Sequence, residues 1–109
     1  PDTLARFLAR RTPLQALLDA DALRGRLAVR AWRPGDRMQP LGAPGVRKLQ
    51  DIFTDLKLPR LQRLATPILT LDDEPVWIIG HCIADRVKVS PITALVAEFA
   101  FLPSPGVGP

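Results

Sequence analysis

The sequence predicts a small α+β domain of short, mostly antiparallel strands in a β-sandwich-like sheet, with two or three helices. Three observations favour this class. The chain has 109 residues, the length of one ordinary domain. Short runs of β-forming residues are separated by Pro/Gly turns, and the clearest helical period lies in one central segment. Strands do not alternate regularly with helices, which argues against a doubly wound sheet.

The N-terminal segment, residues 1–18, is expected to be helical or a linker. Asp2 and Thr3 can cap a short helix that ends near Arg11, before Pro13. Residues 14–23 stay ambiguous, because their apolar spacing fits a helix whereas Asp-Ala-Asp favours a turn. We expect the main domain to span residues 19–102 and the Pro/Gly tail, residues 103–109, to fray.

The central elements begin with a strand over residues 27–32, in which Arg30 faces away from Leu27, Val29 and Ala31. Pro34-Gly35-Asp36 is a turn, and residues 38–46 are a loop with two prolines and two glycines. A helix follows from Arg47 to Lys57, ended by Pro59. Its apolar face is expected to contain Leu49, Ile52, Phe53 and Leu56. Residues 60–64 can form one more helical turn.

The residue pattern of the C-terminal half predicts mainly strands. Residues 68–71 and 76–79 form a hairpin joined by Asp72-Asp73-Glu74-Pro75. Residues 85–89 alternate in polarity, and residues 95–102 form the last strand.

Residues that could perform catalysis or bind metal are scarce, and we predict no catalytic and no metal-binding residue in this chain. His81 and Cys82 are neighbours, so on a strand their side chains point to opposite faces. An acidic hairpin turn is commoner than a cation site at residues 72–74. No phosphate-cradling or HExxH motif occurs, and one cysteine excludes an internal disulfide. The longest apolar run, residues 76–79, is too short to cross a membrane.

The charge is concentrated in one segment. Residues 24–63 carry ten basic and three acidic side chains, a net +7, whereas the rest of the chain carries −3. This favours a phosphate-bearing partner, nucleic acid in particular. The alternative is an arginine-rich solvated surface, since the chain has twelve Arg and three Lys. We read Asp36 as a turn-former that holds Arg33 or Arg37 in place. The candidate RNA-binding residues are Arg33, Arg37, Arg47, Lys48, Lys57, Arg60, Arg63, Arg86 and Lys88.

The same region resembles the C-terminal domain of bacterial tRNA(Ile)-lysidine synthetase over about residues 19–100. That family has the pattern R-x-G-D-R-x-x-P-L-G, then K-L-x-D-x-x-x-D-x-K-V-P, then R-x-x-x-P-x-L. It continues with a strand of the type V-W-V-x-G and an ending such as D-x-R-x-K-V-x-x-x-T. The matching residues are Arg33, Gly35, Asp36, Arg37, Pro40, Leu41, Gly42, Lys48, Leu49, Asp51, Asp55, Lys57, Pro59, Arg60, Arg63, Pro67, Leu69, Trp77, Gly80, Asp85, Arg86, Lys88, Val89 and Thr93. Three departures from the family's usual residues matter: Leu58 replaces valine, Val46 a small polar residue, and Cys82 an arginine.

The resemblance implies a fold shared with a domain of the phenylalanyl-tRNA synthetase β subunit. It also implies a parent ligase that uses ATP and Mg²⁺ to attach lysine to the wobble cytidine of the isoleucine tRNA with a CAU anticodon. Catalysis in that family belongs to an N-terminal domain with an SGGxDS motif, which this chain lacks. We therefore expect this chain to need no cofactor, to be inactive alone, and to grip the acceptor stem of the tRNA.

The other expected partners are the remaining domains of the parent ligase. We expect the protein to be cytoplasmic and to bind no membrane. Because the chain begins at Pro1 and its only methionine is Met38, we expect it to be part of a longer protein. The alternative function is a non-catalytic structural or protein-interaction domain that keeps the fold without contacting RNA.

Overall fold

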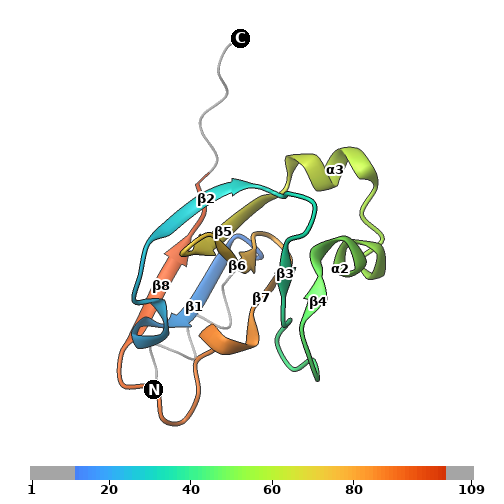
Figure 1. The fold of residues 1–109 in the computed structure, drawn as a ribbon. Helices are drawn as coiled ribbons and strands as arrows, with labels where there is room; N and C mark the ends of the chain where they lie inside the picture. The colour runs from blue at the N-terminus through green and yellow to red at the C-terminus, as the bar shows by residue number, and fades with distance from the viewer. Residues whose placement is uncertain (1–11, 103–109) are drawn as a thin grey trace.

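The computed structural model describes residues 12–102 and places three small antiparallel sheets around one core (Figure 1). The largest sheet has the strand order β2-β5-β6-β7, where β2 is Leu27–Ala31, β5 Pro67–Leu71, β6 Glu74–Ile78 and β7 Cys82–Ile83. The two-stranded sheets pair β1, Gln15–Asp19, with β8, Val96–Ala100, and β3, Arg37–Met38, with β4, Arg47–Lys48. The predicted α+β class is confirmed.

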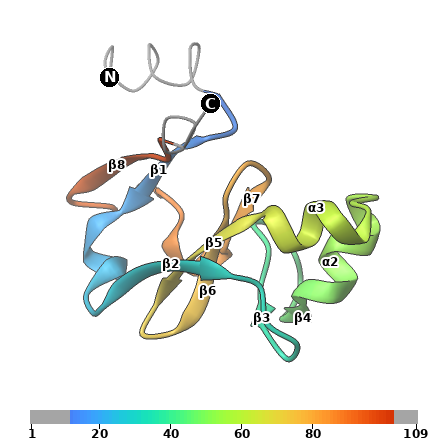
Figure 2. The same cartoon turned by 90° about the horizontal axis from the view of Figure 1, so that it is seen from above.

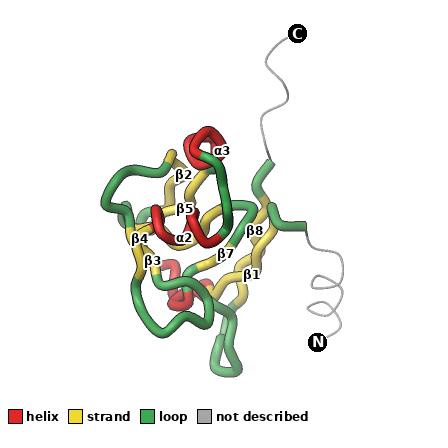
Figure 3. Tube along the Cα trace, turned by 90° about the vertical axis from the view of Figure 1, so that its right-hand side faces the viewer, coloured by secondary structure: helices red, strands yellow, loops and turns green. Residues whose placement is uncertain are grey.

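Within residues 12–102, two α-helices and two 3-10 turns complete the fold. The helices are α2, Leu49–Asp55, and α3, Arg60–Ala65, and the 3-10 turns are η1, Ala20–Leu23, and η2, Asp85–Val87. Figures 1 and 2 both place β3, β4, α2 and α3 on one side of the molecule, away from β1 and β8. Figure 3 views the molecule from the side that carries these two helices.

The core contains the residues that the central patterns predicted. Leu49 and Phe53 of α2 are fully buried and Ile52 nearly so, which confirms the apolar helix face, whereas Leu56 is 40% exposed. Phe53 packs edge-on against Trp32, with their ring centroids 5.9 Å apart. The faces of β5 and β6 supply most of the other buried side chains, among them Ile68, Val76 and Ile78.

The hairpin of β5 and β6 is confirmed, and its turn is tighter than predicted. Asp72 and Asp73 form a two-residue connection, and their φ angles of 51° and 68° are those of the turn type that best matches strand twist. The acidic residues here therefore make a turn, as the sequence indicated.

Four expectations about local structure need correction. Residues 15–18 are not helical or a linker, because they belong to β1 and pair with β8. Arg47 and Lys48 form β4, so α2 begins two residues later than predicted. Met38 belongs to β3, so the loop begins after it. The alternating residues 85–89 contain the 3-10 turn η2, whose main chain closes a hydrogen bond from Lys88 N to Asp85 O. The proposed helix over residues 2–11 and the tail lie outside the described residues.

Candidate nucleic-acid interface

The turn after β2 is held by Arg30, a residue that the sequence analysis did not select. The Arg30 guanidinium donates to both oxygens of the Asp36 carboxylate at 2.9 Å, and to the Asp73 carboxylate and carbonyl at 3.0 Å. Only 14% of the Arg30 side chain and 9% of the Asp36 side chain are exposed. A bidentate pair of this kind fixes geometry as well as charge, so Arg30 attaches the turn to the β5–β6 hairpin.

Asp36 performs the turn-forming role that its position in the sequence predicted. Its carboxylate accepts the main-chain N–H of Arg33 at 2.8 Å. The Arg33 side chain turns toward Asp73, at 3.1 Å. The Arg30 guanidinium, and after it Arg33, lowers the pKa of the Asp73 carboxyl. Asp36 in turn raises the pKa of Arg30, so Arg30 and Asp73 both stay charged near neutral pH.

Five of the nine candidate cations have a partner within the fold. Arg33 pairs with Asp73, Arg47 with Asp55 at 2.6 Å, Arg86 with Glu74 at 3.4 Å, and Lys88 with Asp85 at 3.1 Å. Arg63 donates to the Leu58 carbonyl at 2.7 Å, and its guanidinium lies 5.9 Å from the centroid of the Phe53 ring. These five side chains therefore make contacts within the fold, in addition to any contact with a ligand.

The other four candidates form what we call the basic flank: Arg37, Lys48, Lys57 and Arg60. Each is exposed, and none forms an ion pair with any residue in 12–102. The pairing of β3 with β4 sets Arg37 directly opposite Lys48. Like charges directly opposite each other destabilise a strand pair, so these two cations repel one another in the free protein.

The start of α2 is also unfavourable for a cation. Lys48 occupies its N-cap, and no side chain accepts a hydrogen bond there. One free N–H of the first turn is satisfied instead by the main chain, since Leu49 N donates to the Asp36 carbonyl at 2.9 Å. A positive charge at a helix N-terminus opposes the helix dipole. Arg60, the first residue of α3, meets the same unfavourable field.

Lys57 lies where glycine would be the usual residue. After α2, the Lys57 N–H donates to the Thr54 carbonyl and the Leu58 N–H to the Phe53 carbonyl, each at 3.0 Å. This is a Schellman motif, which needs a left-handed residue at the position of Lys57, and its φ is 57°. A residue with a Cβ costs free energy in that conformation. Lys57 therefore makes the folded chain less stable than glycine would at this position.

His81 and Cys82 show no sign of a nucleophile pair. Burial raises the pKa of the Cys82 thiol, which keeps it protonated, and lowers the pKa of His81. No group of three or more potential metal ligands occurs among the residues that the structure describes. Within the same residues, no helix is long and apolar enough to span a membrane.

Comparison with known proteins places this geometry in a family. A family model described as "TilS substrate C-terminal domain" matches residues 27–97. The tRNA(Ile)-lysidine synthase of Symbiobacterium thermophilum is 54% identical over 69 residues, covering 63% of this chain and 14% of that protein. The enzyme of the same name from Caldanaerobacter subterraneus is 36% identical over 83 residues, covering 74% of this chain and 18% of that protein. This chain thus spans less than a fifth of the length of either relative.

A solved structure described as "Crystal structure of TILS C-terminal domain" aligns with a TM-score of 0.64 and 28% identity. The alignment covers 85% of this chain and 75% of that one. Sequence motifs, family model and fold agree, and the chain belongs to the TilS substrate C-terminal domain family.

Proposed function

We propose that this chain is the tRNA-recognition domain of an ATP-dependent ligase that attaches lysine to the wobble cytidine of isoleucine tRNA. In this proposal the domain grips the acceptor stem of the tRNA with a CAU anticodon. The catalytic domain, with its ATP and Mg²⁺, belongs to the rest of the parent enzyme. Support for the ligase comes from the relatives, which are named tRNA(Ile)-lysidine synthase.

One observation carries the RNA-binding part of the proposal. All four cations of the basic flank lack an acidic partner among residues 12–102, and each occupies a position where it destabilises the free protein. Phosphate oxygens would remove the repulsion between Arg37 and Lys48 and would neutralise the cations at the two helix starts. An A-form duplex is held mainly through its backbone and shape, and unpaired cations on β3, on β4, just after α2 and on α3, which share one side of the molecule, suit that kind of contact.

The test compares two pairs of substitutions that change the charge equally. R37Q/R60Q removes two arginines of the basic flank, whereas R24Q/R26Q removes two exposed arginines outside it. Binding to an isoleucine tRNA transcript is measured at several salt concentrations. Each phosphate contact contributes about 0.9 to the slope of log K against log salt for a duplex of the B-DNA type. We expect R37Q/R60Q to flatten the slope by nearly two units.

The control pair R24Q/R26Q should change that slope by less than half as much. Adding K48Q and K57Q should flatten it further, while circular dichroism shows that every variant stays folded. Equal effects of the two arginine pairs would mean that net charge alone drives binding, and the basic flank would then not be the RNA contact.

A second candidate function is a protein-interaction domain. The observation in its favour is α3, none of whose residues is buried, with Leu61 80% and Leu64 54% exposed. If this alternative holds, L61E/L64E will abolish binding to the other domains of the parent enzyme, and the variants of the basic flank will leave tRNA affinity unchanged.

A further inference from the structure

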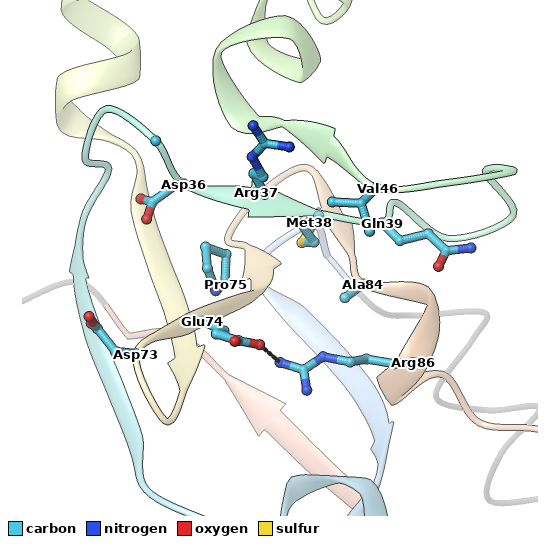
Figure 4. A pocket seen from close by; sticks show the side chains of 11 residues that line it. Asp36, Arg37, Met38, Gln39, Val46, Asp73, Glu74, Pro75, Ala84 and Arg86 are labelled. Atoms are coloured by element: carbon cyan, nitrogen blue, oxygen red, sulfur yellow. Dashed lines mark hydrogen bonds and ion pairs between the residues drawn. The ribbon is translucent and has the colours of Figure 1, made fainter.

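A pocket of about 470 Å³ opens beside the basic flank, between β3, the β5–β6 hairpin and η2 (Figure 4). Met38, Pro75 and Ala84 are among its lining residues, and all three are buried. Arg37, Glu74 and Arg86 also line it. Its size falls within the range of small-molecule sites, roughly 300–1,000 Å³. The pocket therefore combines buried apolar residues with charged ones.

The charges around the pocket leave one cation uncompensated. The carboxylates of Asp36 and Asp73 are occupied by Arg30 and Arg33, and Glu74 pairs with Arg86. Arg37 is left without an acidic partner within residues 12–102. Its side chain projects from the face of β3 opposite Met38, so the free cation lies beside the pocket and not inside it (Figure 4). A ligand with an apolar body in the pocket and a negative group outside it matches this arrangement.

The ion pair between Glu74 and Arg86 is the adjustable part of the pocket. Figure 4 shows the two side chains reaching toward each other, while Arg37 projects from the other side of β3. Their closest atoms are 3.4 Å apart, and the side chains are 73% and 50% exposed. Exposed pairs of this kind add little stability, so Arg86 can leave Glu74 at low cost. A free guanidinium stacks well on planar rings.

We propose that this pocket receives one unpaired nucleotide of the RNA held by the basic flank. The base lies against Met38, Pro75 and Ala84, and Arg86 stacks on its open face. The neighbouring phosphates stay on the basic flank, at Arg37 on the other side of β3. A base inside a duplex is stacked and paired and cannot enter a pocket, whereas unpaired bases at loops and ends are the usual targets of specific RNA recognition. The inference rests on the proposed function, and a free mononucleotide would offer the same chemistry.

The experiment uses the 109-residue chain with two RNA hairpins of identical stem, one blunt and one with a four-nucleotide 3′ overhang. The measured quantity is the ratio of their dissociation constants. We expect the overhang to bind about tenfold tighter, as one well-stacked base would give. R86M should reduce this ratio to near one. The matched control R24M, which removes an arginine from the exposed pair with Asp21, should leave the ratio unchanged.

A second measurement locates the contact. The overhang carries a 4-thiouridine, and crosslinked peptides are identified by mass spectrometry. Crosslinks to the segments around Met38 and Arg86 support the proposal. Crosslinks elsewhere, or a ratio that R86M does not alter, overturn it.

The remaining outcomes distinguish the pocket proposal from the proposed function, and RNA from a free nucleotide as the ligand. Salt-dependent binding of the blunt hairpin with no advantage for the overhang refutes the pocket and leaves the proposed function standing. Failure of both hairpins to bind refutes the proposed function itself. Adenosine or cytidine monophosphate binding as tightly as the overhang would assign the pocket to a free nucleotide and overturn its assignment to RNA.

Discussion

Replacing Arg30 by methionine tests whether one buried guanidinium holds the turn that precedes the basic flank. R30M keeps the aliphatic stem and removes five hydrogen bonds, to Asp36, to Asp73 and to the carbonyl of Ala31. It leaves the Asp36 carboxylate almost buried without its cation. Breaking a buried pair on one side costs about 3–5 kcal/mol. The partial exposure of both side chains places this case near the lower end, at about 3 kcal/mol.

Urea denaturation followed by circular dichroism measures this loss. A domain of this size unfolds with about 5–15 kcal/mol in total, so R30M should lower Tm by about 15 °C with an unchanged m-value. R30K should recover less than half of the loss, because an ammonium cannot bridge a carboxylate in the bidentate manner. The exposed pair of Arg24 with Asp21 provides the control, and R24M should change stability by less than about 0.5 kcal/mol.

The result that refutes this reasoning is an R30M variant that melts within about 2 °C of the unsubstituted chain. The double variant R30M/D36L supplies a second check. If the unpaired carboxylate causes most of the loss, removing it as well should restore part of the stability, whereas purely additive losses would show that the two side chains do not interact.

Other consequences are open to measurement. F53A removes a fully buried ring and should cost about 3–5 kcal/mol, whereas L61A on the exposed face of α3 should cost less than about 0.5; equal melting temperatures would contradict the packing described for α2. K57G relieves a positive φ and should stabilise the chain by about 1 kcal/mol while weakening RNA binding, and a loss of stability would count against the Schellman motif. The Gly42 N–H, and after it Lys88, lowers the pKa of Asp85. The stability from this ionised carboxylate is therefore present above the ordinary pKa and is lost as pH falls from about 5 through the lowered value. Acid titration of Tm should be flatter in D85N, and identical curves would argue against this role. The chain alone should release no pyrophosphate from ATP, lysine and tRNA, and release above background would reveal a catalytic site.

Local chemistry allowed parts of this molecule to be predicted without a structure. The residues at 72 and 73 are good turn formers between two β-rich runs, and they make the turn. The period of Leu49, Ile52 and Phe53 predicts the buried face of α2, because neighbouring side chains along a helix recur on one side. The spacing of Arg33, Asp36 and the later basic residues indicated the family. Each of these signals lies within a few residues or in a fixed order along the chain.

What the tertiary structure decided depends on contacts between distant segments. Arg30 lies on a strand whose apolar neighbours Leu27 and Val29 are 40% and 52% exposed, yet Arg30 itself is largely buried, because Asp73 reaches it from the hairpin 43 residues away. Residues 15–19 form a strand because β8 pairs with them, not because of their own propensity. The division of nine candidate cations into paired and unpaired sets also follows from the fold. Charge along a sequence shows how many cations are present, whereas the positions of the acids in space determine which remain free for a phosphate.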